Sequence, residues 1–310
     1  MIPTVLITGR DGQLGFELRR ALAPLGNIVV VDQDTVNFCD LNAVRQLMRH
    51  TRPNVIVNAA GYTAVDRAET ERGLAQTVNS YVPGVMAEEL QRLRGKLIVH
   101  YSTDYVFDGA ATQPYTEDDA TKPLNAYGES KLAGERAIQQ SGVPYVVLRT
   151  EWLYATRGTN FLLTILRLAR DGKPLRIIAD QIGSPTWARM LAEASAQIVI
   201  RFITTSMSDA TTWSGVYHLT AAGRTTWHGF AEAILKESLQ RLTQLRRPLD
   251  WCEGALASLT AISTSEYPTP ARRPAYSVLS NEKIARVFGI RLPDWHHQLH
   301  MALEDFAFPT

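Results

Sequence analysis

The chain has 310 residues, of which 45% are apolar and 20% are charged, and its formal net charge is +1. These values are typical of a globular protein with one large domain or two lobes. The near-neutral charge gives no reason to expect nucleic acid or an anionic membrane as a partner. No run of residues is apolar for long enough to span a bilayer, so we expect no membrane partner.

The cysteines and the start of the chain bear on its location. Cys39 and Cys252 lie far apart, without the spacing of metal ligands or of a disulfide framework, which favours a reduced, cytoplasmic protein. Residues 1–9 lack a basic region and run directly into a glycine turn, so we interpret them as a strand and not as a signal peptide. The histidines form no set with ligand-like spacing, and we expect no metal site.

The first predicted unit is a strand, a glycine-rich turn and a helix. Residues 4–8 are an apolar run, and residues 16–25 have helical periodicity. Between them stands Gly9-Arg10-Asp11-Gly12-Gln13-Leu14-Gly15. Glycines let the backbone approach a pyrophosphate closely, and a helix N-terminus offers free N–H groups. The turn therefore predicts a dinucleotide site, although its glycine spacing differs from the commonest pattern and a plain turn is the alternative.

The second predicted strand, residues 28–31, ends at Asp32. An acid about twenty residues past the glycines can bind the ribose hydroxyls of an adenosine. Asp32 favours NADH, because a 2′-phosphate would meet a negative charge there. Arg10 favours NADPH, because a guanidinium can pair with that phosphate. The preference between NADPH and NADH therefore stays open.

The next segments offer further candidate cofactor contacts. Asp40 precedes a predicted helix that runs from Leu41 to about His50, and it is either simply a good N-cap or a neighbour of the adenine ring. A third strand, residues 55–57, leads into Asn58-Ala59-Ala60-Gly61-Tyr62-Thr63. Small residues at the carboxyl end of a strand let a cofactor lie against the backbone.

Three polar residues follow in helical stretches. Asp66 and Glu69 fit a solvent-facing role. Asn79 lies inside the helical pattern of residues 71–91, although asparagine is a poor helix former. Its side chain can bond back to the chain, and we also count it among the candidate cofactor residues.

The fourth strand and the helix after it carry the candidate catalytic groups. Residues 96–101 form a strand that ends in Ser102-Thr103-Asp104, where the hydroxyls suggest a carbonyl-binding site. Tyr127 and Lys131 are four residues apart, which places them one turn apart on one helix face. An ammonium beside a phenol favours the phenolate and lowers its pKa, so the pair suits a general acid. Taken alone, this spacing also fits an exposed helix face.

A fifth predicted strand, residues 144–149, completes a series of five strands that each lead into a helix. Such a series specifies an α/β fold with a Rossmann-like, doubly wound parallel sheet. We expect residues 1–150 to form an NAD(P)-binding domain and residues 151–310 to form mainly a smaller, mixed α/β substrate lobe. Residues near 170–180 are candidates to return to the sheet. The remaining predictions are helices over 160–170, 189–202, 227–239, 281–288 and 294–306, strands over 175–178 and 216–219, and a loop-rich stretch over 248–274.

Several motifs follow one another along nearly the whole chain. They are Thr8-Gly-x-x-Gly-Gln-Leu-Gly15, Asn58-Ala-Ala-Gly-Tyr-Thr63, Ser102-Thr-Asp-Tyr-Val-Phe107, Tyr127-Gly-Glu-x-Lys131, Asp180-Gln-x-Gly-x-Pro-Thr186 and Tyr267-Pro-Thr-Pro-Ala-Arg-Arg-Pro274. Together they resemble the extended short-chain dehydrogenase/reductase family and, within it, the reductases of nucleotide sugars. Each motif alone is modest, but the series in this order is very specific.

The resemblance implies a reduction that depends on NADH or NADPH. The cofactor would give a hydride to C4 of a small dTDP-sugar, dTDP-4-dehydro-β-L-rhamnose. Tyr127 would protonate the forming alkoxide, and Lys131 would lower the pKa of that tyrosine and hold the nicotinamide ribose. Thr103 would hydrogen-bond the substrate oxygen, and Asp104 and Trp152 would contact the sugar nucleotide.

The resemblance also implies the binding residues. Arg272 or Arg273 would meet the substrate diphosphate, since a guanidinium suits bidentate phosphate recognition, and a structural ion pair is the alternative. The candidate cofactor-binding residues are Gly9, Arg10, Gly12, Gln13, Leu14, Gly15, Asp32, Asp40, Leu41, Ala59, Ala60, Gly61, Tyr62, Thr63, Asn79, Tyr127 and Lys131.

One departure from the family concerns metal. Some relatives are described as dimers that Mg²⁺ bridges through glutamates. Glu17 matches one such ligand, but Arg189 stands where another glutamate is expected. We therefore expect no metal bridge, and both a monomer and a homodimer stay open.

Two rival functions stay open as well. The first is another sugar-nucleotide enzyme of the same fold, an epimerase or a dehydratase. Dehydratases of this family place an acid directly after the Thr-Asp pair, where this chain has Tyr105, which disfavours them. The second is a non-catalytic regulatory subunit of the methionine adenosyltransferase type. The intact Thr103, Tyr127 and Lys131 favour catalysis over that role.

Overall fold

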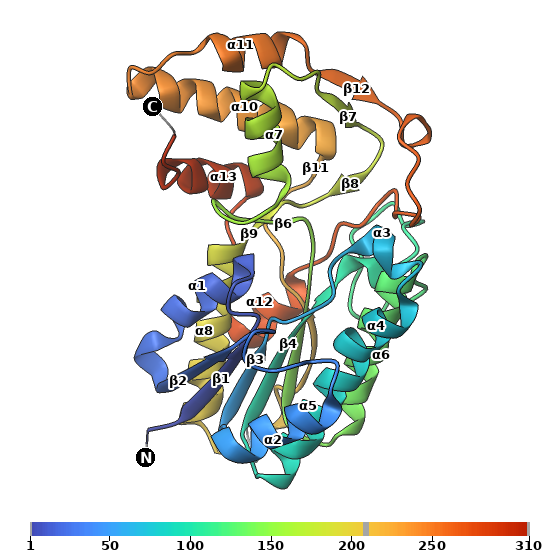
Figure 1. Cartoon of the computed structure of the whole chain (residues 1–310), viewed down its shortest axis with the longest axis vertical. Coiled ribbons are helices and arrows are strands. Elements are labelled where there is room, and N and C mark those ends of the chain that lie inside the picture. Colours follow the sequence, from blue (N-terminus) through green and yellow to red (C-terminus); the bar gives the residue numbers. More distant parts are fainter. Residues whose placement is uncertain (1, 207–210, 309–310) are drawn as a thin grey trace.

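A six-stranded parallel sheet forms the centre of the computed structural model, which describes residues 2–206 and 211–308 (Figure 1). The strands lie in the order β10 (Gly215–His218), β5 (Tyr145–Thr150), β4 (Leu97–Thr103), β3 (Val55–Asn58), β1 (Thr4–Thr8), β2 (Asn27–Val31). Strand β1 has β2 on one side and β3 on the other, so the direction in which successive strands are added to the sheet reverses at β1. Sheets of this kind bind ligands in the crevice at the carboxyl ends of such strands. The predicted doubly wound parallel sheet is confirmed.

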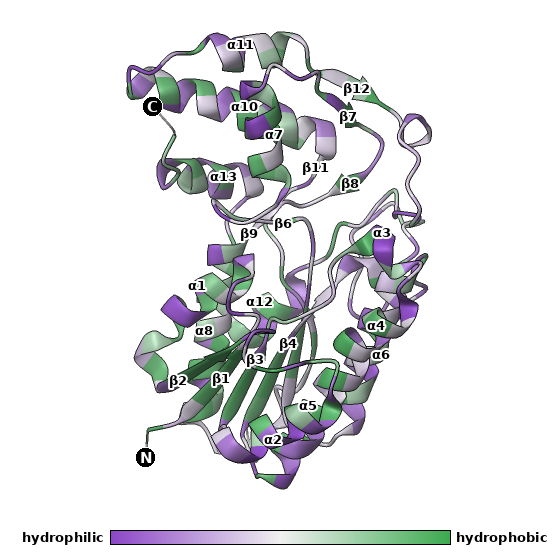
Figure 2. Ribbon diagram, viewed as in Figure 1, coloured by the Kyte–Doolittle hydropathy of each residue, from purple (hydrophilic) through white to green (hydrophobic). Residues whose placement is uncertain are grey.

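Helices cover both faces of the sheet, which is why its strands are mostly apolar. All residues of β3 and β4 are buried, and Figure 2 shows β1, β2 and β3 mostly in the hydrophobic colour. One face carries α1 (Gln13–Ala21), α8 (Ala188–Thr204) and α12 (Glu282–Phe288); the other carries α2 (Leu41–Thr51), α5 (Val82–Arg92) and α6 (Ala126–Gln140). Short helical segments join these elements: η1 (Ala23–Leu25), α3 (Val65–Ala68), α4 (Arg72–Gln76), the π-turn η2 (Thr77–Tyr81) and η3 (Asp104–Val106).

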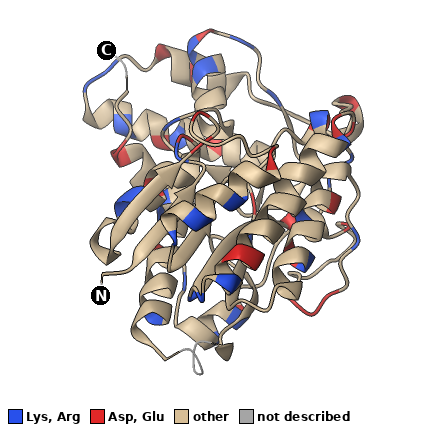
Figure 3. Ribbon diagram, turned by 60° about the horizontal axis from the view of Figure 1, so that its bottom comes forward, with Lys and Arg blue, Asp and Glu red and all other residues tan. Residues whose placement is uncertain are grey.

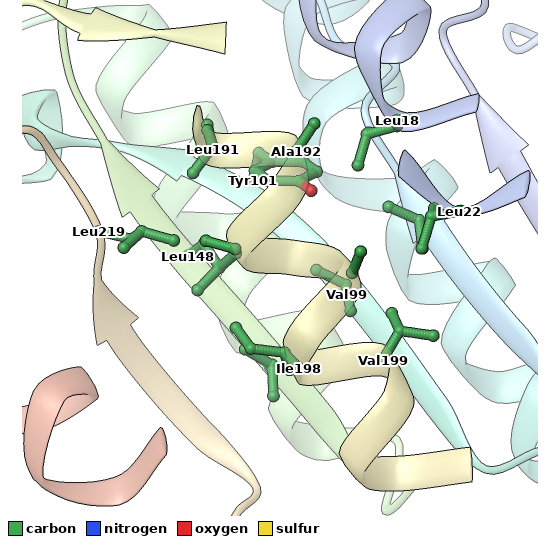
Figure 4. Close-up of a cluster of buried hydrophobic side chains, with 14 of the residues drawn as sticks. Leu18, Leu22, Val99, Tyr101, Leu148, Leu191, Ala192, Ile198, Val199 and Leu219 are labelled. Carbon is green, nitrogen blue, oxygen red and sulfur yellow. The ribbon is translucent and has the colours of Figure 1, made fainter. Parts of the chain in front are cut away.

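Helix α8 comes from the second half of the chain but packs on the sheet. Figure 4 shows Leu191 and Ile198 of α8 over the strands that carry Val99 and Leu148. Leu18 of α1 belongs to the same buried cluster. The apolar stripe of α8 therefore closes the core on this face of the sheet.

Most of the remaining second half forms a smaller lobe beyond the carboxyl ends of the sheet strands (Figure 1). It has its own apolar cluster, which includes Tyr154, Phe230 and Trp295. Its helices are α7 (Phe161–Arg170), α10 (Trp227–Gln244), α11 (Asp250–Ala257) and α13 (Trp295–Glu304). Its strands pair as β6 (Leu153–Tyr154) with β9 (Thr186–Trp187), β7 (Arg176–Ile178) with β12 (Thr260–Ile262), and β8 (Ile182–Gly183) with β11 (Thr225–Thr226); η4 (Thr264–Glu266) follows β12.

Two expectations about this half are wrong. Residues near 170–180 do not return to the central sheet, because β7 pairs with β12 and its side chains are only partly buried. The sixth strand of the sheet is instead β10, in which Val216 pairs with Val147 of β5. The stretch 248–274 also holds more regular structure than expected, since it contains α11 and β12.

Charge is mixed over the molecule. Figure 3 shows Lys and Arg interspersed with Asp and Glu on the helices. Among the described residues, no helix combines the length and the apolarity that crossing a membrane requires.

Candidate active site

The glycine turn after β1 forms a cradle at the crevice. Gly9 has φ +77°, and a Cβ there would lie 2.8 Å from the carbonyl of Ala59, so only glycine lets the turn pass this close to the end of β3. Gly12 is the N-cap of α1, and no side chain caps that terminus. The buried Gln13 Oε1 also has no hydrogen-bond partner among the residues that the structure describes. The free N–H groups at the start of α1 fit the pyrophosphate of a dinucleotide. The unpaired Gln13 oxygen fits an amide group of the same ligand.

Asp32 and Arg10 lie together at the end of β2. The carboxylate of Asp32 accepts hydrogen bonds from the backbone N–H groups of Asp11 and Gln33, both at 2.8 Å. Arg10 pairs with Asp11 at 2.9 Å and with Asp34 at 2.7 Å, and these bonds hold the pKa of Arg10 above its usual range. A 2′-phosphate at Arg10 would therefore compete with two carboxylates.

Asp40 acts as the N-cap of α2. Its Oδ1 accepts from the N–H groups of Asn42 at 2.8 Å and Ala43 at 3.3 Å. The capping role expected from the sequence is confirmed, and Leu41 is the first residue of the helix.

Asn79 joins the loop after β3 to helix α6. Its Oδ1 accepts from the N–H of Tyr62 at 2.8 Å, and its Nδ2 donates to Tyr62 O and to Ser130 Oγ, both at 3.0 Å. The expectation that Asn79 bonds back to the chain is confirmed, but the backbone groups that it contacts belong to Tyr62 and not to its own helix. Asn79 lies in the π-turn η2. Single π-turns of this kind often occur at functional sites.

The first turn of α6 is fixed from three sides. Asn125 Oδ1 accepts from the N–H of Gly128, and Glu69 Oε1 accepts from the N–H of Ala126, both at 2.8 Å. A Cβ on Gly128 would lie 2.2 Å from the carbonyl oxygen of Tyr105, so the helix contacts the segment after β4 directly. Glu69 therefore has a structural partner, which the sequence did not indicate.

Thr103 and Tyr127 meet where β4 ends. Thr103 Oγ1 accepts from the N–H of Tyr105 at 3.1 Å and donates to Asp104 Oδ1 at 2.9 Å. Burial, with a smaller contribution from the Asp104 charge, raises the pKa of Tyr127 to about 12, and hydrogen bonding with Thr103 partly offsets this rise. The expected lowering of this pKa by Lys131 is therefore wrong for this arrangement, and the phenol keeps its proton at neutral pH.

The side chain of Lys131 is directed toward strand β4 and not toward Tyr127. Its Nζ donates to Tyr101 O at 2.5 Å and lies 3.4 Å from His100 Nε2. A Cβ on Gly61 would lie 3.9 Å from Nζ, which places the ammonium beside the loop after β3. Burial lowers the pKa of Lys131 to about 8, and the charge of Glu135 partly opposes that change. Lys131 can therefore reach a ligand lying on this loop.

Replacing Lys131 with methionine is expected to weaken dinucleotide binding and to lower turnover roughly 100-fold, because the site loses a buried charge while keeping its packing. The wild-type protein should also bind a dinucleotide more weakly as the pH rises through about 8, where Lys131 loses its proton. Fluorescence titration with the dinucleotide across pH measures both effects. Lys96→Met is the matched control, because Lys96 also donates to a backbone carbonyl, Ile203 O, away from the crevice. A Lys131→Met protein with wild-type affinity and turnover would contradict this role.

The two candidate arginines have different surroundings. Arg273 forms a bidentate ion pair with Asp66, at 2.9 and 2.8 Å. This is the structural ion pair that was the alternative to binding the substrate diphosphate. Asp66 therefore does not simply face solvent. Arg272 is exposed, and its carbonyl oxygen accepts from Asn125 Nδ2 at 2.8 Å, which ties this segment to the start of α6. Among the residues that the structure describes, no ion pair engages the Arg272 guanidinium.

Trp152 lies at the junction between the sheet and the lobe. Its φ of 45° is unusual for a bulky residue, and its ring stacks on Trp227 at 3.6 Å with an angle of 9° between the planes. Backbone strain of this kind often marks a functional site. The sequence indicated Trp152 but did not indicate its partner Trp227.

Polar residues that were not among the candidate site residues also lie beneath the crevice. Thr8 Oγ1 donates to Asn58 Oδ1 at 2.6 Å, and Asn58 Nδ2 contacts His100 Nδ1 at 3.0 Å. His100 in turn adjoins Lys131, and burial together with that charge holds the pKa of His100 well below its usual range. Glu151, directly before Trp152, is also buried. Thr8 and Asn58 belong to sequence motifs at the ends of β1 and β3, whereas His100 and Glu151 had no signal beyond being polar inside or just after an apolar strand.

The residues considered for a metal bridge are engaged within the chain. Arg189 forms ion pairs with Glu17, at 3.4 Å, and with Asp305. These contacts join α1, α8 and the segment after α13. Over the described parts of the chain, no three His, Cys, Asp or Glu side chains come together as a metal site would require.

Taken together, the crevice can bind a dinucleotide in the glycine turn and present two hydroxyls, from Thr103 and Tyr127, to one carbonyl oxygen. Comparisons with known proteins agree with this chemistry. The family model described as RmlD substrate binding domain matches residues 3–308. A dTDP-4-dehydrorhamnose reductase of Burkholderia thailandensis is 46% identical over 301 residues, covering 97% of this chain and 98% of the relative.

Two solved structures are also similar. The crystal structure of a dTDP-4-dehydrorhamnose reductase from Clostridium acetobutylicum has a TM-score of 0.84 and 32% identity, covering 97% of this chain and 98% of its own. The corresponding structure from Bacillus anthracis, in complex with NADP, has a TM-score of 0.83 and 31% identity, covering 98% and 100%.

Proposed function

The chain belongs to the dTDP-4-dehydrorhamnose reductase family, and from that premise we propose that it reduces the C4 keto group of dTDP-4-dehydro-β-L-rhamnose to give dTDP-β-L-rhamnose. It is an oxidoreductase that uses NADPH or NADH. One observation gives the main support for this function. The hydroxyls of Thr103 and Tyr127 lie together at the carboxyl end of β4, beside the glycine turn. Donors placed there stabilise the charge that develops on a carbonyl oxygen during reduction.

In the mechanism, NAD(P)H supplies the hydride for C4 when it is bound. The turn at residues 9–15 holds the pyrophosphate, and Lys131 holds the nicotinamide ribose. Tyr127 still carries its proton at neutral pH and transfers it to the C4 oxygen as negative charge develops there. Thr103 donates a hydrogen bond to the same oxygen, which lowers the barrier further.

Individual binding roles are part of the proposal. The cofactor contacts comprise Gly9, Arg10, Gly12, Gln13, Leu14, Gly15, Asp32, Asp40, Leu41, Ala59, Ala60, Gly61, Tyr62, Thr63 and Asn79, together with Tyr127 and Lys131. Most of these residues lie in the glycine turn with the start of α1 or in the loop after β3, which line the crevice. Asp104 and Trp152 contact the sugar nucleotide. The exposed Arg272 is better placed than Arg273 to bind the diphosphate, because Asp66 already engages Arg273.

We also propose the division of labour between residues 1–150, which bind NAD(P)H, and residues 151–310, which mainly bind the substrate. The position of Trp152 at the junction of sheet and lobe supports it. A reduced, cytoplasmic location is a further proposal, supported by Cys39 and Cys252, which are both free thiols.

The test follows the absorbance of NADH and of NADPH, separately, with dTDP-4-dehydro-6-deoxyglucose and a 3,5-epimerase, which together generate the 4-keto substrate. Oxidation that requires every component supports the reductase and ranks the two cofactors. Folded protein that binds cofactor but oxidises neither would favour another sugar nucleotide or a regulatory role. NAD retained through purification would favour an epimerase or dehydratase.

We expect the oligomeric state, monomer or homodimer, to be independent of Mg²⁺. The reason is that Arg189 neutralises Glu17 within the chain, so a divalent cation would meet a guanidinium there. Sedimentation velocity with Mg²⁺ and with EDTA measures this directly. A dimer that dissociates in EDTA would show the expectation to be wrong.

A further inference from the structure

A turn of the lobe, residues 155–160 between β6 and α7, lies against the start of α1. The side chain of Asn160 holds this lobe turn together, because its Nδ2 donates to two carbonyl oxygens of the turn, at 2.8 and 2.9 Å. A Cβ on Gly158 would lie 3.6 Å from Gln13 Cγ. Helix α1 begins at the end of the sheet that faces the lobe (Figure 1). The lobe turn therefore reaches the glycine turn.

Arg157 brings a positive charge from the lobe turn to this place. Its guanidinium lies over the ring of Phe16, with Cζ 3.3 Å from the ring centroid. Its Nη1 is buried and has no hydrogen-bond partner in the part of the chain that the structure describes. A guanidinium stays charged at any physiological pH, so a buried N–H of this group calls for an acceptor.

The nearest carboxylate does not serve as that acceptor. Hydrogen bonds from Arg10 hold the pKa of Asp11 below its usual range, and the charge of Arg157 contributes to this effect, which places Arg157 near Asp11. Arg10 donates to both carboxylate oxygens of Asp11, at 3.0 and 2.9 Å. Asp11 is thus engaged by Arg10, and Arg157 stays available to a ligand.

The position of Arg157 favours one part of a dinucleotide. It lies beside Gln13 and Phe16, at the helix N-terminus whose free N–H groups fit the pyrophosphate. The ribose that carries the 2′-phosphate of NADPH is instead expected at Asp32, after β2, and the substrate diphosphate at Arg272, near α6. A guanidinium can also bind phosphate oxygens through two parallel hydrogen bonds.

We propose that Arg157 donates to the pyrophosphate of NAD(P)H from the side of the lobe, so that the bound cofactor ties the lobe turn to α1. This inference rests on the dinucleotide binding within the proposed function and not on the identity of the sugar. It gives the second half of the chain a residue in the cofactor site. Asn160 also caps α7, since its Oδ1 accepts from the N–H of Leu163 at 3.1 Å, so cofactor binding should steady that helix of the lobe as well.

The first test measures the affinity of Arg157→Met for NADH, NADPH and dTDP, by fluorescence titration or calorimetry. Methionine keeps the packing on Phe16 but removes the charge and the N–H donors. We expect the affinity for both dinucleotides to fall about 10-fold or more, because a charge-assisted hydrogen bond is lost. The affinity for dTDP should stay unchanged.

Arg20→Met is the matched control. Arg20 also lies over the ring of Phe16, at 3.5 Å, but its Nη1 already donates to Phe16 O at 3.0 Å. Its loss removes an exposed charge near the same ring, so we expect the dinucleotide affinity to stay within about twofold of the wild type. Equal losses in the two variants would show that general positive charge, and not a bond from Arg157, supports binding, and would overturn the proposal.

The three ligands separate the possible acceptors. Wild-type affinity of Arg157→Met for both dinucleotides overturns the proposal. A loss confined to NADPH would assign Arg157 to the 2′-phosphate, and a loss confined to dTDP would assign it to the substrate diphosphate. Either result also overturns binding of the pyrophosphate.

The second test is hydrogen exchange of the backbone amides of residues 155–163, with and without saturating NADH. Bound NADH should slow this exchange in the wild type and in Arg20→Met but not in Arg157→Met. Equal slowing in Arg157→Met would overturn the tie between cofactor and lobe turn. A wild type that shows both effects of Arg157 but does not reduce the dTDP-sugar contradicts the proposed reduction and leaves the role of Arg157 supported.

Discussion

Replacing Tyr127 with phenylalanine is expected to lower kcat about 100-fold or more while leaving the affinity for NADPH and NADH nearly unchanged. The substitution removes only the hydroxyl that donates the proton. Its ring packs edge-on against Tyr105, with centroids 5.9 Å apart, and phenylalanine keeps that contact. Steady-state kinetics with the dTDP-sugar and fluorescence titration with each dinucleotide separate the two effects.

Tyr154→Phe is the matched control for this prediction. Tyr154 is also buried, and within the described part of the chain its hydroxyl has no hydrogen-bond partner, so losing that hydroxyl should leave both turnover and binding intact. Turnover in Tyr127→Phe equal to that of the wild type would remove Tyr127 from the role of acid. A joint loss of turnover and dinucleotide affinity would show that the hydroxyl mainly shapes the cofactor site.

The second large effect is expected in stability. Arg149 and Glu135 form a bidentate ion pair, at 3.0 and 2.8 Å, with side chains only 5% and 1% exposed. Ser102 Oγ donates to the same glutamate at 2.5 Å. Replacing Arg149 with methionine leaves a buried carboxylate without its partner, so we expect the free energy of unfolding to fall by about 3–5 kcal/mol. Denaturant unfolding of the variant and the wild type measures the difference.

Two further variants test the cause of that loss. Arg167→Met breaks an exposed pair with Asp171 at 3.7 Å, one turn apart on α7, and should change stability by less than about 1 kcal/mol. The double variant Arg149→Met with Glu135→Leu removes both buried charges, and it should be more stable than Arg149→Met alone. If the double variant is no more stable than Arg149→Met alone, the cost of Arg149→Met comes from packing and not from the unpaired charge.

Local patterns predicted much of the fold and of the site. The glycine turn, the strand ends and the Tyr127–Lys131 spacing are each set within a few residues, so the sequence alone indicated them. Asp40 was identified as an N-cap for the same reason, because a cap depends on its immediate neighbours.

Long-range partners could not be predicted in this way. The sequence alone does not show that Lys131 donates to Tyr101 O, or that Arg273 pairs with Asp66, more than two hundred residues away in the chain. The return of β10 to the sheet is another example. Residues 216–219 were predicted as a strand, but the choice of β5 as its neighbour depends on the whole topology. Glu151 was missed because a single acid after a strand has no pattern of its own.

Helix α8 and strand β10 have a consequence for recombining this protein with its relatives. A fragment that ends at Thr150 would keep five strands of the sheet but lose β10 and the helix that covers Val99 and Leu148 (Figure 4). Its bare apolar face would promote aggregation. A functional chimera must therefore exchange the lobe as three separate inserts, near 153–187, 222–275 and 295–308, while α8, β10 and α12 stay with their original sheet. A single crossover at the middle of the gene would instead place the α8 and β10 of one parent on the sheet of the other.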